Sequence, residues 1–244
     1  MTSLRADREK LAAEIKALAG ASTADRIGIA PGSAFTPDEL GELGREFGPV
    51  RSVVVLAQRI VDPVQTVRFR SALTYDDSRV AASFADAMLR DACWRVVGIL
   101  GDAGYRAVIA RNLRYGADEP RHRLSYKKAG VLAGLGAFGK SQLLIHPEWG
   151  PWLWLRTVVT DAALPADAPI DFAPCEQCGL CVAACPVGAL ADDRFDAASC
   201  EGLYSERGAP TVVGLSPHGQ INCEECMRAC PVGPAPPRLG ERLP

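Results

Sequence analysis

Residues 175–186 read CEQCGLCVAACP and residues 223–231 read CEECMRACP, and these two stretches hold most of the nine cysteines of the chain. The first is spaced Cys-x2-Cys-x2-Cys-x3-Cys-Pro; the second is spaced Cys-x2-Cys-x3-Cys-Pro, with Cys200 upstream in place of a first ligand. In such runs three thiolates converge on one iron–sulfur cluster, while the cysteine before proline binds a second one. The spacing therefore predicts two 4Fe-4S clusters with crossed ligands, one held by Cys175, Cys178, Cys181 and Cys230 and the other by Cys185, Cys200, Cys223 and Cys226.

Disulfide bonds and zinc are the other uses of cysteines at this density. Disulfides suit small secreted domains, and zinc sites usually separate two ligand pairs by a longer gap. Neither accounts for two runs that each end in Cys-Pro. Cys93 lies outside both runs in a helical apolar pattern, so we expect it to be a small core residue.

Size and composition are those of an ordinary globular protein, with 244 residues, 48% hydrophobic and 23% charged. The N-terminal stretch is charged throughout, and no run approaches the roughly 18 apolar residues of a membrane span. We therefore expect a cytoplasmic protein, away from membranes, whose thiols stay reduced. A formal net charge of -2 gives no overall attraction to nucleic acid, and the arginines between Arg111 and Arg123 are interpreted as a solvated loop.

Hydrophobic periodicity predicts an α/β domain over the first 170 residues. Leu11, Ile15 and Leu18 indicate an amphipathic helix that ends near Gly20. Short strands are expected at 27–29 and, buried on both faces, at 53–56. The segment between these two strands, which contains Pro31, Gly32 and Pro37, is expected to be a loop.

Further along, a helix is predicted over residues 80–100 and a strand at 105–109. Strands at 143–145 and 152–160 flank the turn-rich HisProGluTrpGlyPro and are expected to pair with each other as antiparallel neighbours. Composition shifts to Pro, Ala and Asp over residues 164–174. The predicted domains are a cofactor-binding α/β domain (1–170), a ferredoxin-like domain with two 4Fe-4S clusters (171–234) and a tail (235–244).

Residues 134–141, GLGAFGKS, match the phosphate-loop pattern G-x4-G-K-[ST] and also contain G-x-G-x-x-G. Both nucleotide-binding motifs need a helix directly after the glycines, and here Pro147 leaves no room for one. Instead, Gly134, Gly136 and Gly139 are predicted to let the backbone approach a large flat cofactor or a packed cluster, and Lys140 is expected to meet an anionic cofactor tail or substrate.

Several segments together resemble the epoxyqueuosine reductase family and its shorter relatives: GYRAV at 104–108, SYKKAGVLAGLGAFGK at 125–140, LLIHPEWGP at 143–151, VVTDAAL at 158–164 and the double cysteine motif. They are similar, more distantly, to the corrinoid reductive dehalogenases. The resemblance implies a nitroreductase-like domain that binds cobalamin where related flavin enzymes bind flavin. It also implies an oxidoreductase in which two 4Fe-4S clusters pass electrons to the corrinoid for reductive chemistry, which in the namesake reaction removes an epoxide oxygen from a modified tRNA base.

Two catalytic candidates follow from that resemblance. Tyr126 is a phenol beside a lysine and could donate a proton, as such a pair is thought to do in the dehalogenases; the alternative is a packing tyrosine that opens a helix capped by Ser125. The family's acidic residue lies shortly before AlaGlyLeuGly, where this sequence has Asp118-Glu119-Pro120, so Glu119 is the second candidate.

The expected partners are a low-potential electron donor, such as a ferredoxin or flavodoxin, and a small-molecule substrate. Full-length family members carry a helical-repeat extension for tRNA binding after the ferredoxin module, whereas this sequence stops at Pro244, so weak tRNA binding is expected. Two other functions remain open. One is a ferredoxin-type electron carrier or reactivating partner of another cobalamin enzyme, and the other is a flavin-dependent reductase that uses FMN.

Overall fold

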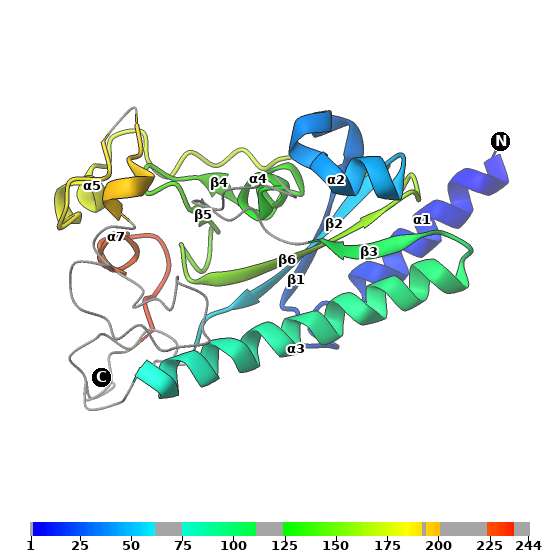
Figure 1. Ribbon diagram of the computed structural model, residues 1–244, viewed down its shortest axis with the longest axis horizontal. Coiled ribbons are helices and arrows are strands. Elements are labelled where there is room, and N and C mark those ends of the chain that lie inside the picture. The colour runs from blue at the N-terminus through cyan, green and yellow to red at the C-terminus, as the bar shows by residue number, and fades with distance from the viewer. Residues whose placement is uncertain (1, 62–74, 111–123, 192–193, 201–223, 237–244) are drawn as a thin grey trace. The chain divides into compact units, whose positions relative to one another are not determined.

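A four-stranded antiparallel sheet organises the first part of the chain (Figure 1). The structure, a computed structural model, describes residues 2–61, 75–110, 124–191, 194–200 and 224–236. The strands are β1 (Arg26–Pro31), β2 (Ser52–Arg59), β3 (Ala107–Ala110) and β6 (Leu153–Thr160), in the order β1-β2-β6-β3. The predicted combination of helices and sheet is thereby confirmed.

Strand β2 lies inside the sheet, as its continuous apolar sequence predicts. Val54 faces Ile29 of β1 on one side and Val158 of β6 on the other. Residues 52–57 are all buried. Because a strand covered on both faces has no solvent-facing side, its sequence shows no polar alternation.

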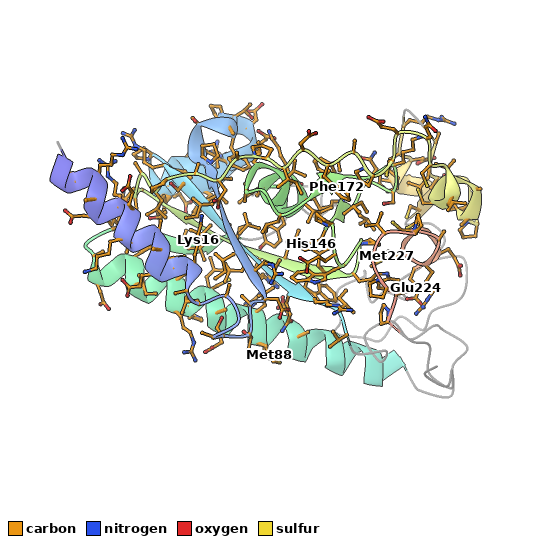
Figure 2. The ribbon with its side chains drawn as sticks, turned by 180° about the vertical axis from the view of Figure 1, so that it is seen from behind. Lys16, Met88, His146, Phe172, Glu224 and Met227 are labelled. Carbon is orange, nitrogen blue, oxygen red and sulfur yellow. The ribbon has the colours of Figure 1, made fainter. Side chains whose placement is uncertain are left out.

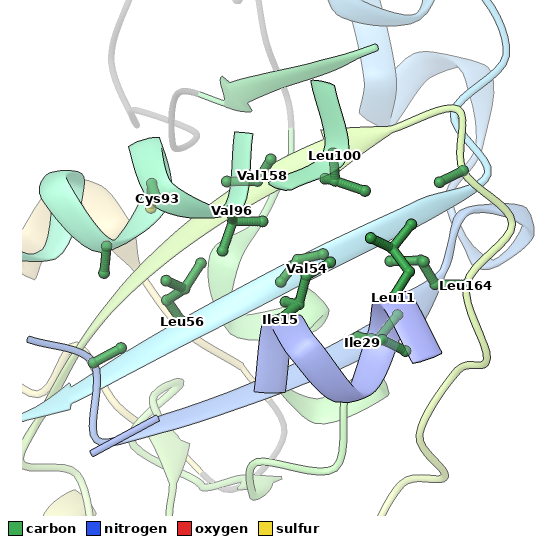
Figure 3. Close-up of a cluster of buried hydrophobic side chains, with 14 of the residues drawn as sticks. Leu11, Ile15, Ile29, Val54, Leu56, Cys93, Val96, Leu100, Val158 and Leu164 are labelled. Atoms are coloured by element: carbon green, nitrogen blue, oxygen red, sulfur yellow. The ribbon is translucent and has the colours of Figure 1, made fainter. Parts of the chain in front are cut away.

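Two helices cover one face of the sheet, α1 (Thr2–Lys16) and α3 (Tyr75–Asp102), and both were predicted. Their apolar stripes pack against alternate residues of the strands (Figure 3). Cys93 is fully buried in this core, which confirms its predicted packing role. Burial raises the pKa of its thiol to about 12. The core includes Leu11, Ile15, Ile29, Val54, Leu56, Leu89, Val96, Leu100 and Val158.

The opposite face is covered by the short helix α4 (Tyr126–Leu132). Ser125 caps this helix, as predicted, because its side chain accepts a hydrogen bond from the Lys128 backbone N–H. The end of α4 approaches β1 so closely that a Cβ at Gly28 would lie 2.3 Å from the carbonyl oxygen of Ala133. Gly28 is therefore required for close packing between helix and strand.

The predicted loop after β1 is wrong, because this segment forms a 3-10 turn, η1 (Gly32–Ala34), and then a helix, α2 (Pro37–Phe47). Thr36 and Glu39 form a reciprocal capping box, and Pro37 occupies the first helical turn. Lys128 Nζ also pairs with Glu39 Oε1 at 2.6 Å. Burial alone would raise the pKa of Glu39, but the hydrogen bonds from Lys128 and Thr36 and the charge of Lys128 hold it below the ordinary value of 4.5.

The predicted pairing of residues 143–145 with residues 152–160 is also wrong. Strand β5 (Leu144–Ile145) lies outside the four-stranded sheet, and β6 pairs instead with β2 and β3. The intervening turn closes on itself, since His146 and Gly150 exchange two backbone hydrogen bonds of 2.8 Å. The backbone groups of β6 form their hydrogen bonds with β2 and β3, which are both longer than the two-residue β5, so no hairpin forms between β5 and β6.

The chain divides into two compact units. The sheet unit comprises Met1–Arg59, Ala85–Phe138 and Leu153–Phe172, and includes the short strand β4 (Ala137–Phe138). The cysteine unit comprises Ile60–Phe84, Gly139–Trp152 and Ala173–Pro244, and includes helices α5 (Leu180–Ala184) and α7 (Glu225–Arg228). This division differs from the predicted boundaries, because residues 60–84 and 139–152 group with the cysteines. No helix in the described ranges is both long and apolar enough to cross a membrane.

Candidate functional site

The first cysteine run folds as a tight turn leading into α5. The Cys178 N–H bonds the Cys175 carbonyl at 3.3 Å, and Cys181 is a buried residue of the helix. Cys185 ends the helix with its N–H on the Val182 carbonyl. The turn thus gathers three thiols on one side, while the thiol before Pro186 follows a full helical turn later.

Cys230, from the second run, lies in the same neighbourhood as the first run. Burial raises the pKa of the Cys181 thiol, and the charges of Cys175 and Cys178 raise it further. Burial also raises the pKa of Cys230, partly opposed by a backbone hydrogen bond from Val232, and Cys175 and Cys178 again add to the rise. Helices α5 and α7 are in contact. These are the four cysteines that the crossed-ligand scheme assigns to one cluster.

The thiols are near one another without being at ligand distance. Within the described ranges, no three Cys, His, Asp or Glu side chains converge closely enough to hold a metal ion as they stand, and the cysteines described there form no disulfide. Electrostatic influence reaches further than a metal–sulfur bond. Since metal binding and local folding are coupled at such sites, the donor set of four soft thiolates fits an iron–sulfur cluster that draws the ligands together.

Three of the four cysteines assigned to the other cluster are described, and Cys223 lies outside the described residues. Cys200 lies in a helical turn whose start Asp196 caps. The Asp196 carboxylate accepts hydrogen bonds from Ser199 Oγ at 2.6 Å and from the Ser199 N–H at 3.1 Å, which lowers the pKa of Asp196. The Cys200 N–H bonds the Asp196 carbonyl. The cap therefore fixes the backbone at Cys200.

A buried ion pair of Glu224 and Arg228 lies at α7, between the cysteines of the second run. Figure 2 labels Glu224 beside Met227 of this helix. Arg228 Nε lies 2.9 Å from Glu224 Oε1, and the two side chains are only 10% and 4% exposed. The Arg228 guanidinium stands 5.2 Å from the centre of the Trp152 ring and donates to the Pro236 carbonyl at 3.2 Å. Sequence reasoning missed this pair, although charged residues inside a cysteine run were a visible signal.

The HisProGluTrpGlyPro turn packs against the chain that follows Cys230. Gly150 and Gly233 both have positive φ, and a Cβ on Gly150 would lie 1.8 Å from the Val232 carbonyl oxygen. His146 is buried, stacks on Trp149 with ring centres 4.0 Å apart, and accepts at Nδ1 from the Glu148 N–H. The turn thus has a structural role in the cysteine unit.

Tyr126 is buried in the sheet unit, where its hydroxyl donates to the Ala110 carbonyl. Arg156 Nη1 donates to the same hydroxyl at 3.3 Å, and the Arg156 guanidinium also pairs with Asp86. Burial lowers the pKa of Arg156. Arg156 is thus one cation at the phenol, and Lys128 pairs with Glu39. An arginine within the apolar strand LWLRTVVT was the signal for this residue.

Arg156 also lines a groove of about 320 Å³ between α3 and β3. Trp94, 66% exposed, forms one wall, and the backbone of β3 forms the other. Ala110, whose carbonyl receives the Tyr126 hydroxyl, lies at the end of this groove. The tyrosine, the arginine and the groove are therefore contiguous.

The predicted glycine loop packs against its own chain. Gly134 has φ +71°, and its Cβ would lie 2.7 Å from the Ala168 carbonyl oxygen; a Cβ at Gly139 would lie 2.7 Å from Ile145. Gly136 is buried and Lys140 partly buried. No helix follows the loop, so the structure agrees with the rejection of a phosphate loop. Glu119 lies outside the described residues, as do Arg111 and Arg123.

Comparison with known proteins gives a consistent likeness. Residues 168–191 match the family model of the 4Fe-4S binding domain. The epoxyqueuosine reductase of Synechococcus sp. (strain RCC307) is 37% identical over 101 residues, which cover 41% of this chain and 31% of that protein. The chain thus spans about a third of the length of this curated relative.

Solved structures extend the likeness to the fold. An epoxyqueuosine reductase bound to an epoxyqueuosine-modified tRNA stem loop has a TM-score of 0.59 and 17% identity, covering 92% of this chain and 66% of its own. A reductive dehalogenase linked to B12-dependent dehalogenation has a TM-score of 0.61 and 21% identity, covering 89% and 31%. The chain is therefore similar in sequence to epoxyqueuosine reductases, contains a 4Fe-4S binding domain, and shares its fold with these reductases and with reductive dehalogenases.

Proposed function

We propose that this chain is an iron–sulfur oxidoreductase of the epoxyqueuosine reductase type, with two 4Fe-4S clusters in the cysteine unit and a nitroreductase-like sheet unit. The observation that carries the proposal is the contact between α5 and α7, which brings the second cysteine run beside the first, as the crossed-ligand arrangement requires; the influence of Cys175 and Cys178 on the pKa of Cys230 agrees with it. Cys185, Cys200, Cys223 and Cys226 are the proposed ligands of the second cluster. When bound, 4Fe-4S clusters supply one-electron transfer over a wide range of potentials.

The cysteine unit contributes binding and shielding in this proposal. The turn at Cys175–Cys181 presents three thiolates, and the chain after Cys230 is held against the 146–151 turn by Gly150 and Gly233. Burial of Cys181 and Cys230 disfavours their free thiolates. Metal binding would offset that penalty, because bound thiolates share their charge with the cluster.

In the sheet unit, Tyr126 and Arg156 are the proposed proton-handling pair. The Tyr126 hydroxyl donates a hydrogen bond to the Ala110 carbonyl, and Arg156 donates one to the phenol oxygen. A cationic donor at that oxygen favours the phenolate once the proton has left. Tyr126 could therefore release a proton to a reduced substrate and regain it from solvent, while Asp86 keeps Arg156 in position.

Cobalamin is proposed as the electron-accepting cofactor, with FMN as the alternative. The support is the fold shared with a B12-dependent dehalogenase. The described glycine loop itself packs against Ala168 and Ile145 and therefore offers no open cradle for a corrinoid. Calorimetry with hydroxocobalamin and with FMN separates the two, and tight binding of FMN alone would overturn the cobalamin assignment.

The proposed partners are a low-potential ferredoxin or flavodoxin and an electrophilic substrate. A tRNA stem loop is the ligand of the structural neighbour, whereas a formal charge of -2 here favours a smaller molecule. Turnover of epoxyqueuosine within tRNA and as the free nucleoside should be compared. Efficient conversion within tRNA would contradict the preference for a small substrate, and electron transfer without turnover of either would favour the electron-carrier alternative.

Cluster composition is the direct test of the proposal. Anaerobic iron and sulfide analysis should give about eight irons per chain, and about four would contradict two clusters. Cys230→Ser should remove the same paramagnetic signal as Cys175→Ser, whereas Cys200→Ser should remove the other. Cys93→Ser is the matched control and should leave the iron content unchanged. Loss of both signals equally in all three ligand variants would disprove the crossed scheme.

A further inference from the structure

We infer that the buried ion pair of Glu224 and Arg228 sets the reduction potential of the iron–sulfur clusters, with the two charges acting in opposite directions. The inference rests on the proposed function, because it requires that the cysteine unit bind clusters. It concerns residues that are not ligands themselves. Glu224 lies between Cys223 and Cys226, and Arg228 lies between Cys226 and Cys230.

Because both charges are buried, their electrostatic effect on neighbouring groups is only weakly screened. With side chains 10% and 4% exposed, Arg228 and Glu224 are hardly screened by solvent or salt. Exposed pairs in the same protein, such as Arg95 with Asp91 at 57% each, are screened. A charge within a few residues of three predicted ligands, in a medium of low polarity, therefore acts on cluster charge far more strongly than a surface charge does.

The geometry holds the pair rigidly in place. Arg228 contacts the Trp152 ring, the Pro236 carbonyl and Glu224, and Trp152 itself is fully buried. The Nε and Oε1 atoms are at ion-pair distance, but neither makes an aligned hydrogen bond with the other. The charges of the two groups attract each other at this distance, and the contacts of Arg228 with Pro236 and Trp152 hold the pair in place.

Stability alone is a poor reason to bury such a pair. Removing two charges from water costs more than their attraction returns in many proteins, and apolar replacements of similar volume are often neutral or stabilising. An effect of the two charges on the reduction potential of the clusters explains the buried pair better. Cluster potentials depend on net local charge, hydrogen bonds to sulfur and solvent exposure, and this pair contributes to the first of these.

The sign of each effect is fixed by the charge of the reduced cluster. Reduction adds an electron, so a nearby anion disfavours the reduced form and a nearby cation favours it. Glu224→Gln should raise the potential, and Arg228→Gln should lower it. The double variant should lie between the single ones, since it removes both charges.

The experiment is a redox titration of the full anaerobic protein, followed by electron paramagnetic resonance, on the wild type, both single variants and the double variant. We expect each single variant to change the ratio of reduced to oxidised cluster at fixed potential about tenfold, or about 59 mV for one electron. Arg194→Gln removes an exposed positive charge of the cysteine unit and should change the ratio less than twofold.

Arg228→Lys keeps the positive charge and should stay near the wild-type potential. A shift as large as that of Arg228→Gln would overturn the inference, as would single variants that move in the same direction. Loss of iron from both single variants and also from Arg228→Lys would show that the ion pair has only a structural role, and this result would equally overturn the inference. A wild-type protein without clusters would instead contradict the proposed function, so the two failures are distinguishable.

Discussion

Replacing Gly150 by alanine should destabilise the cysteine unit far more than the same change at Gly188. Both glycines have nearly the same backbone conformation, with φ of +60° and +62°. An alanine in this left-handed region costs about 1–2 kcal/mol at either position. Among the described residues, a Cβ at Gly188 meets no atom within 4 Å, whereas at Gly150 it would lie 1.8 Å from the Val232 carbonyl oxygen.

Because the obstructing atom at Gly150 belongs to the backbone, no side-chain rotation relieves the clash. Overpacking adds about 1–3 kcal/mol, so Gly150→Ala should lose about 2–5 kcal/mol in total and Gly188→Ala about 1–2 kcal/mol. Urea unfolding measured by tryptophan fluorescence is the assay, since Trp149 adjoins the site. Equal losses in the two variants, within about 0.5 kcal/mol, would show that the 146–151 turn does not meet Val232.

Three further outcomes are expected. Asp86→Asn should cost about 1–3 kcal/mol in urea unfolding, because it leaves the largely buried Arg156 with a weaker partner, whereas Asp91→Asn, in an exposed pair, should cost less than about 0.5 kcal/mol. The pKa of Glu39 is depressed in the folded state, so its stabilisation is fully present above the ordinary pKa and is lost as the pH falls through the lowered one. The stability difference between wild type and Glu39→Gln should therefore narrow as the pH falls below the ordinary value of 4.5. Cys93, with a pKa near 12 and a fully buried side chain, should resist iodoacetamide at neutral pH until the protein is unfolded, and rapid alkylation of the native protein would contradict its place in the core.

Local sequence predicted the elements whose pattern is set by burial. The apolar run of β2 and the helical stripe that contains Cys93 are examples, because a buried face must be apolar at the period of its element. Helix α2 was missed although its Thr36 and Glu39 capping box is readable in the sequence. Pro31, Gly32 and Pro37 indicate a loop in the same segment, but Pro37 lies in the first turn of the helix, where proline is tolerated.

Long-range partnerships could not be predicted in the same way. That Arg156 would meet Tyr126 depends on the antiparallel order of the sheet, which no local pattern specifies. The predicted hairpin of residues 143–145 and 152–160 was wrong for the same reason, since β6 pairs with the longer strands β2 and β3. Pairing that is remote in sequence is decided by the whole fold.

The position of β6 between β2 and β3 determines the order in which a growing chain can fold. A ribosome releases β1 and β2 first and can leave them as a hairpin-like pair, but β3 acquires its neighbour only after residues 153–160 have emerged. The sheet is thus sealed by its latest strand in synthesis, immediately before the cysteines are translated. All the strands of the sheet precede both cysteine runs in the sequence, so the chain can complete its sheet before the second run has emerged.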